Sequence, residues 1–166
     1  MFHVNDYVVY GLTGVCQITD IRKDEYISSN ETQYYVLNPV YNNNMTIKVP
    51  VNSQNIMMRA VISKHDAMSL IAAMPEIKTV WIDNEKQRTA DFKAALKSGN
   101  HENWVKIIKT LYLEKKARSA SGRKLTKTDE DILNEAEKQL NQELSIALDI
   151  SCDAVGSYII KHIKKK

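Results

Sequence analysis

The four histidines are the side chains best suited to acid–base chemistry or metal binding near neutral pH, and their spacing favours neither. They stand at positions 3, 65, 101 and 162, and none lies at a metal-binding spacing such as HExxH or CxxC. GxSxG, Walker and GxGxxG motifs are also absent, and the chain has only five glycines for phosphate-binding loops. The sequence therefore carries no local signature of catalysis, although a site built from distant residues leaves no such motif.

Acidic residues gather at two places, Asp83/Glu85 and Asp129/Glu130/Asp131. Both groups stand at predicted helix starts, where carboxylates cap the chain and suit the positive end of the helix dipole. We therefore expect capping groups here and no catalytic pair of carboxylates.

Three lysines have a spacing that suggests a different chemistry. Lys86, Lys93 and Lys97 are seven and four residues apart, which places them on one face of a helix, whereas Arg88 points nearer to Phe92. Such a stripe can hold DNA phosphates, which give salt-dependent affinity but little sequence reading. An ordinary solvated helix face has the same pattern, and the residues alone favour that interpretation over a DNA contact. On the following helix, three further lysines are expected to face solvent: Lys106, Lys109 and Lys116.

Composition sets the class of protein. The 166 residues suffice for one large domain or two small ones, and the net charge is +3. The excess lies in the second half: residues 1–78 carry 6 Lys/Arg and 7 Asp/Glu, and residues 79–166 carry 17 and 13. No apolar run could span a bilayer, and the N-terminus does not resemble a signal peptide. Cys16 and Cys152 are too few for a disulfide framework, so we expect buried thiols and a cytoplasmic protein.

The first 60 residues have the pattern of a β domain. Short runs of strand-forming residues alternate with glycine, asparagine and proline turns, and they predict strands at 7–10, 15–21, 32–37, 45–49 and about 57–59. The alternation slips at Ile21, which indicates a bulge or the end of the strand. Pro39 and Pro50 should end the third and fourth strands. A small five-stranded barrel is expected, because closure removes exposed edges.

The apolar period then becomes helical. Ser63 is expected to cap a helix that ends near Met74 before Pro75, and residues 76–83 form a connector. A second helix should begin at Asn84 or Glu85. The next three helices should be capped by Asn100, by Thr126 or Thr128, and by Ser151. Trp104 belongs to the core stripe of the third helix. The predicted fold class is α+β, with a barrel domain at 1–60 and a five-helix bundle at 61–166.

Several short motifs follow one another in order along the chain, and each is weak alone. They are Phe2-x-x-Asn5-Asp6-x-Val8-Val9-Tyr10 leading into Gly14-Val15, Tyr35-x-Leu37, Met45 to Pro50, Arg88-x-x-x-Phe92-x-x-x-Leu96-x-Ser98-Gly99-Asn100, Leu125, and Ala136-x-x-x-Leu140-x-x-Glu143-Leu144-x-x-Ala147-Leu148. Together, over roughly residues 2–148, they resemble the CarD/CdnL family of bacterial transcription factors. The barrel is similar to the module that this family shares with the transcription-repair coupling factor, whose helicase motor does not fit in this chain.

The resemblance implies a Tudor-like barrel that binds the β subunit of RNA polymerase. It also implies a helical domain that contacts promoter DNA at the upstream edge of the melted region and stabilises the open complex. It implies no cofactor, no metal, no membrane and no small-molecule substrate, and we expect a monomer.

Site residues follow from the same resemblance. Lys48 matches a basic family position at the polymerase contact, within the motif that also contains Thr46. A second basic contact is expected near the end of the second strand, where gap-free alignment places Asp24 and where Arg22 or Lys23 could substitute. The expected DNA contacts are Lys86, Arg88, Lys93, Lys97 and Trp81.

The family's minor-groove wedge is a tryptophan, but this chain has Glu85 at that position. Trp81 lies four residues earlier, where it could reach DNA or could pack the barrel against the bundle. Two other functions remain open: a polymerase adaptor that does not touch DNA, and a stand-alone DNA-binding repressor. Weak net charge and the lack of a clear recognition helix argue against the repressor.

Overall fold

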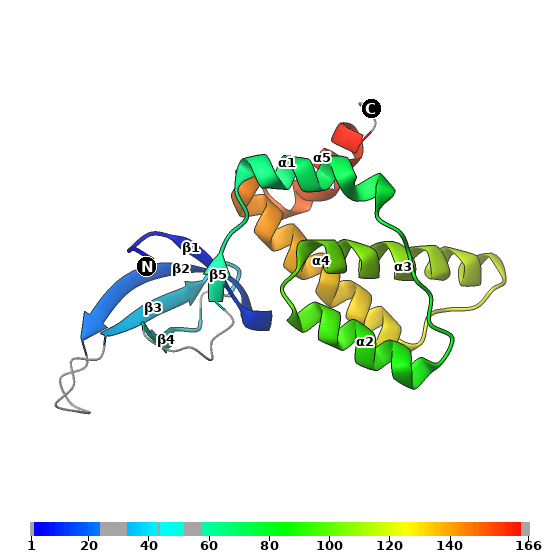
Figure 1. Ribbon diagram of the computed structural model, residues 1–166, viewed down its shortest axis with the longest axis horizontal. Coiled ribbons are helices and arrows are strands. Elements are labelled where there is room, and N and C mark those ends of the chain that lie inside the picture. The colour runs from blue at the N-terminus through cyan, green and yellow to red at the C-terminus, as the bar shows by residue number, and fades with distance from the viewer. Residues whose placement is uncertain (1, 24–32, 43, 52–57, 164–166) are drawn as a thin grey trace. The chain divides into compact units, whose positions relative to one another are not determined.

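The computed structural model of the protein describes residues 2–23, 33–42, 44–51 and 58–163. The chain divides into two compact units, residues 1–61 and residues 62–166, which we call the sheet unit and the helical unit (Figure 1). Some details predicted from the sequence fall outside the described residues: residue 32 of the third strand, Asn43, Met57 and the C-terminal Lys164–Lys166.

The sheet unit is one curled antiparallel sheet, in which the described strands have the order β4-β3-β2-β1-β5 (Figure 1). The strands are β1 (Tyr7–Tyr10), β2 (Gly14–Lys23), β3 (Gln33–Pro39), β4 (Ile47–Pro50) and β5 (Met58–Ala60). No ladder joins β4 to β5 within the described residues, so the sheet is a half-barrel there. The α+β class and the N-terminal β architecture are confirmed.

Strand β2 contains the irregularity that the sequence predicted. The register with β3 shifts between Ile18 and Asp20, which leaves Thr19 as the extra residue of a bulge. The Thr19 hydroxyl donates to the carbonyl of Val36 at 3.3 Å. Because the bulge inverts the alternation, Ile18 and Ile21 both pack on the core. The strand therefore continues past Ile21 instead of ending there.

Two strand ends differ from the prediction. β3 runs to Pro39, two residues beyond its expected end, and β4 begins at Ile47 and includes Pro50. Proline is tolerated at both positions because each is the last residue of its strand, and β4 lies at the edge of the sheet. The core of the unit comes from the alternate residues of four strands: Val8, Cys16, Ile18, Tyr35, Leu37 and Val49.

The helical unit contains α1 (Lys64–Ala73), α2 (Glu85–Lys97), α3 (His101–Ala120), α4 (Lys127–Leu148) and α5 (Val155–Ile163). A 3-10 turn at Met74–Glu76 holds Pro75 and ends α1. The side chains of four residues accept a hydrogen bond from the backbone amide three positions on and so cap the first four helices: Ser63, Asn84, Asn100 and Thr126. These caps confirm the predicted starts and decide for Thr126 over Thr128.

Ser151 does not cap α5, and that prediction is wrong. Its side chain makes no capping bond, and a 3-10 turn at Cys152–Ala154 separates it from the helix. The reason lies at the end of α4, where Asp149 takes a left-handed conformation at φ 54° and redirects the chain.

Apolar side chains from all five helices form the core of this unit. Trp104 is 1% exposed, as expected for the core stripe of α3, and packs in one cluster with Leu111, Leu140 and Leu144. None of the helices in the described part of the chain has the length and apolarity needed to span a bilayer.

Burial should make Cys16 unreactive. Desolvation raises the pKa of its thiol to about 11. The thiolate is the reactive form, so at pH 8 the native protein should react with a disulfide reagent about 100-fold more slowly than the unfolded protein. A Cys152→Ser variant leaves Cys16 as the sole thiol and makes the rate assignable. Equal rates in native and unfolded protein would show that Cys16 is accessible.

Candidate functional site

Strand register brings two of the predicted polymerase contacts onto one face of the sheet. Lys48 on β4 pairs with Val36 on β3, and Val36 pairs with Asp20 on β2. Directly paired residues project from the same face, and Arg22 is two residues from Asp20, so it shares that face. Lys48 and Arg22 are both exposed, and their Cα atoms stand about 12 Å apart, because two strand spacings separate them across the sheet and two residues separate them along it. We call these two side chains the cationic sheet face.

Arg22 already has an acidic partner on its own strand. Its Nε donates to Oδ2 of Asp20 at 2.7 Å, and both side chains are exposed. Hydrogen bonds from Arg22 and from the Ile21 amide lower the pKa of the Asp20 carboxyl. The exposed pair is weak, so Arg22 can exchange this carboxylate for one on a partner.

The other two predicted contacts lie elsewhere. Lys23 ends β2 and, by alternation, points to the opposite face from Arg22. Thr46 is exposed but precedes the first residue of β4, so it lies outside the strand ladder. The structure therefore groups Lys48 with Arg22 and leaves Lys23 and Thr46 apart from them.

Helix α2 presents the predicted lysines to solvent. Lys86, Lys93 and Lys97 are all exposed, and the intervening Ala90 lies on the same side of the helix. No ion pair is recorded for these lysines among the residues that the structure describes. We call the three side chains the α2 lysine stripe. From Lys86 to Lys97 it extends about 16 Å along the helix, which corresponds to roughly five base pairs of duplex DNA.

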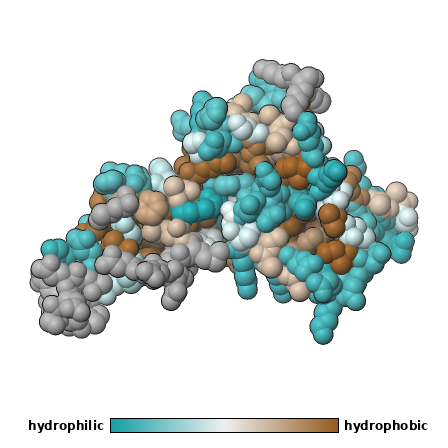
Figure 2. Space-filling model, in the orientation of Figure 1, coloured by the Kyte–Doolittle hydropathy of each residue, from teal (hydrophilic) through white to brown (hydrophobic). Residues whose placement is uncertain are grey.

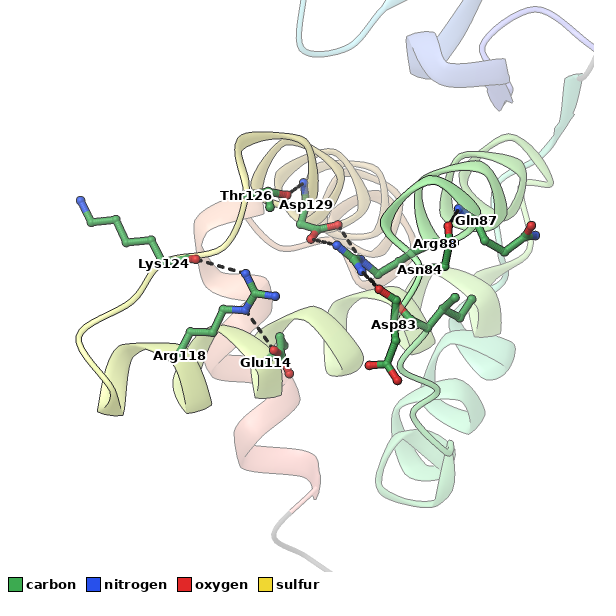
Figure 3. Close-up of polar contacts among 10 residues, drawn as sticks. Asp83, Asn84, Gln87, Arg88, Glu114, Arg118, Lys124, Thr126 and Asp129 are labelled. Atoms are coloured by element: carbon green, nitrogen blue, oxygen red, sulfur yellow. Dashed lines mark hydrogen bonds and ion pairs between the residues drawn. The ribbon is translucent and has the colours of Figure 1, made fainter.

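Arg88 has a different environment, shown in Figure 3. It is 3% exposed, and its Nε and Nη2 donate to the two carboxylate oxygens of Asp129 at 3.1 and 2.8 Å. Its Nη1 donates to the carbonyl of Ile82 at 2.9 Å. This bidentate pair joins the first turn of α2 to the first turn of α4. The DNA contact that the sequence predicts for Arg88 would require this residue to break its ion pair with Asp129.

Trp81 is held on the helical unit itself. Its ring is half-buried, packs against the helical core and lies 4.3 Å from the guanidinium carbon of Arg88. Arg118, which is bound to Glu114 and to the carbonyl of Lys124 (Figure 3), lies 5.7 Å from the same ring. The two cation–π contacts fix the connector between α1 and α2. Trp81 therefore has a packing partner within its own unit.

The turn between α2 and α3 is fixed by hydrogen bonds. Gly99 has φ 69°, a left-handed conformation that ends α2. The Trp104 indole N–H donates to the carbonyl of Leu96 at 3.1 Å, and the amide of Asn100 donates to the Ser98 hydroxyl. These bonds hold the C-terminal end of the α2 lysine stripe in place.

Lys109 corrects one expectation. It does not face solvent: its ammonium donates to the carbonyls of Met74 and Ile77 at 2.9 and 2.6 Å and to that of Pro75 at 3.4 Å. It therefore satisfies carbonyl groups at the end of α1 and at the start of the connector. Lys106 is half-buried, and Lys116 is exposed and lies 5.3 Å from the ring of Tyr112.

Sequence reasoning also missed two buried acids of α4. The sequence pattern predicts a helix-capping charge at Asp129, but this residue is fully buried as the partner of Arg88. Glu143 is fully buried too, and its Oε2 accepts from the Ile62 amide and from Nε2 of His101, each at 2.8 Å. Their partners lie 41 to 81 residues away, so no local pattern indicates them.

Elsewhere the face of the molecule seen in Figure 2 is mostly hydrophilic over the helices, with small apolar areas between. Among the described residues, no group of three or more histidine, cysteine, aspartate or glutamate side chains could hold a metal ion.

The structural role of Arg88 can be tested directly. Arg88→Ala should destabilise the helical unit by about 3–5 kcal/mol, because it leaves the Asp129 carboxylate buried without its partner. Lys93→Ala on the same helix should change stability by less than about 0.5 kcal/mol. Urea unfolding followed by circular dichroism measures both. An Arg88→Ala protein as stable as the Lys93→Ala protein would refute the role.

Two family models match the chain, one for each unit. The model of the CarD-like/TRCF RID domain matches residues 2–62, and that of the CarD C-terminal domain matches residues 69–159. A comparison with curated proteins found no match. The matched segments contain the cationic sheet face and the α2 lysine stripe, and the second alone covers more than half of the chain. The chain therefore belongs to the CarD family of RNA polymerase-interacting transcription regulators.

Proposed function

We propose that the protein binds the β subunit of RNA polymerase through the cationic sheet face and contacts promoter DNA through the α2 lysine stripe. In doing so it stabilises the open complex during initiation. The observation that carries the proposal is the exposed α2 lysine stripe, which has no recorded intramolecular acid partner in the described chain and lies in the CarD C-terminal domain. Binding to polymerase would place the protein in the bacterial cytoplasm.

The sheet unit has the charge needed for the polymerase contact. Lys48 is exposed on the edge strand β4 and has no recorded ion pair among the described residues. A cation on a rigid strand can meet an acidic surface in one register and accelerate encounter. Arg22 adds a second cation on the same face, at the energetic cost of exchanging the Asp20 carboxylate for one on the polymerase.

The helical unit carries side chains suited to contact the phosphate backbone of DNA. Three lysines along about 16 Å of helix suit a row of phosphates, and lysine ammonium groups carry no base-specific geometry. Affinity from three such contacts is small on its own and falls with salt. Prior binding to polymerase would supply the local concentration that makes these contacts effective.

Opening of promoter DNA is an equilibrium, so a protein that contacts the melted form better than the closed form lengthens the lifetime of the open complex. No side chain of this protein needs to react. The effect on transcription would be activating or repressing according to which step limits a given promoter.

The alternative functions make different predictions. An adaptor would bind polymerase equally well, but its effect on open-complex lifetime would not depend on the α2 lysine stripe. A stand-alone repressor would bind promoter DNA tightly without polymerase. A gel shift with and without polymerase separates the repressor from the proposed function.

Lys48→Glu should weaken binding of the full-length protein to the isolated β-subunit lobe by about tenfold, because it opposes like charges at the contact. Titration by isothermal calorimetry measures the affinity. Lys138→Glu makes the same charge change at an exposed site in the helical unit and should bind as the wild type does. Equal affinity of both variants would remove Lys48 from the proposed contact.

Charge reversal of the stripe tests the DNA contact. The triple variant Lys86→Glu, Lys93→Glu, Lys97→Glu should shorten the open-complex lifetime relative to wild type. It should also lower the dependence of DNA affinity on log salt by about 2 to 3, since three phosphate contacts are lost. Lifetimes are measured by competitor challenge of polymerase–promoter complexes.

A matched control reverses three exposed lysines of the helical unit that lie outside α2, namely Lys64, Lys78 and Lys138. It has the same net charge as the stripe variant and should keep the wild-type lifetime. Equal effects of the two triple variants would point to net charge alone and against the stripe.

A further inference from the structure

The last turns of α3 carry a continuous exposed face. Between Tyr112 and Ala120 only Glu114 and Arg118 are half-buried, and every other residue is exposed. At about 100° per residue, the exposed residues cover one arc of roughly 200°, with Lys116 at its middle. We call them the α3 end face, and its members are Tyr112, Leu113, Lys115, Lys116, Ala117, Ser119 and Ala120.

Two large apolar side chains flank the central cation of this face. Tyr112 is 50% exposed and Leu113 is 54% exposed. The ammonium of Lys116 lies 5.3 Å from the centroid of the Tyr112 ring. Tyrosine gives a large contact area with a polar tip, which is why it is enriched at protein interfaces. The α3 end face therefore combines an apolar contact area with a positive charge.

The turn between α3 and α4 adds further positive charge and no acid. Residues 115–127 contain six Lys/Arg and no Asp/Glu. Arg123 and Lys124 are exposed and, like Lys116, have no ion pair recorded in the described part of the chain. The turn is ordered, because the Arg123 amide donates to the carbonyl of Arg118 at 2.7 Å. Figure 3 shows the Lys124 side chain pointing away from the helices.

Acids on one border of the face favour a protein partner over a strand of DNA. Lys115 is bound to Glu130 at 2.9 Å, and Glu137 is close enough to interact with the same lysine. A DNA strand has a negative charge at every nucleotide and would meet these carboxylates, whereas a peptide can place a neutral residue there. A row of phosphates would also leave the exposed Leu113 without an apolar partner.

We propose that the α3 end face docks an acidic segment of the RNA polymerase holoenzyme. An apolar side chain of the segment packs on Tyr112 and Leu113, and its carboxylates pair with Lys116, Arg123 and Lys124. The source of the segment follows from the CarD family, whose members interact with RNA polymerase. The contact is additional to the proposed function, which uses none of these residues.

The first test follows amide chemical shifts of the full-length protein by NMR. The probe is a short synthetic peptide in which glutamate and leucine alternate. One control peptide has serine in place of leucine, and another has lysine in place of glutamate. The probe should shift the amides of residues 112–124 and bind there at least about fivefold more tightly than either control peptide or an oligothymidine strand.

Two variants separate the apolar part of the contact from the charged part. Leu113→Ser and Lys116→Glu should each weaken binding of the probe by about fivefold or more. Val80→Ser and Lys138→Glu are the matched controls, since both side chains are exposed on the same unit, Val80 at 48%. Exposed positions such as these tolerate substitution, so all four variants should fold.

Three outcomes of the titration would overturn the docking surface. They are wild-type affinity in both Leu113→Ser and Lys116→Glu, tighter binding of oligothymidine at residues 112–124, and a probe that shifts none of these amides. Lys48→Glu and the stripe variant test the proposed function and leave the α3 end face intact, so failure of one proposal does not decide the other.

The second test identifies the segment. A photoreactive benzophenone amino acid replaces Ala117, at the edge of the α3 end face, and the full chain is cross-linked in complexes with purified holoenzyme and promoter DNA. Mass spectrometry should place the cross-link on a polymerase segment that has a net negative charge and an apolar residue. The same replacement at Lys138 gives the background. Cross-links to DNA alone, or only at the background level, would overturn the proposal.

Discussion

The arrangement of the helical unit depends on one buried ion pair. Arg88 and Asp129 are 3% and 0% exposed, and their bidentate contact joins the starts of α2 and α4. Burial of two charges is favourable only when the geometry is good and the remaining donors are satisfied, and here the carbonyl of Ile82 accepts from the third guanidinium nitrogen. With this pair formed on the buried face of α2, the opposite face, which carries the lysine stripe, is exposed to solvent.

The arginine and the lysines of α2 therefore have different roles. The planar guanidinium of Arg88 lies in the interior, where it binds both carboxylate oxygens of Asp129. Lysines occupy the exposed stripe, where a contact needs only a positive charge. Trp81 is drawn into the interior group by its contact with Arg88. The aromatic ring of the connector therefore has a packing role within the helical unit.

Local sequence signals predicted most of the fold. The caps at Ser63, Asn84 and Asn100 act over three residues, and β1 matches its predicted range because four strand-forming residues stand between turns. The non-local contacts could not be predicted: Asp129 meets Arg88 across 41 residues, and Glu143 meets Ile62 across 81. For the same reason, only part of the candidate site could be predicted from the sequence. Exposure of the α2 lysine stripe and the separation of Arg88 from it follow from helix period, whereas the burial of Arg88 depends on Asp129, a partner in another helix.

Lys109 has a consequence for the order in which the protein folds. The carbonyls that end α1 are satisfied by an ammonium that lies in the middle of α3, more than thirty residues later. Until α3 docks, these carbonyls remain hydrated, and the loop that must close is long. The end of α1 and the chain that follows it are therefore expected to become structured late, and to open early when amide hydrogens exchange with solvent.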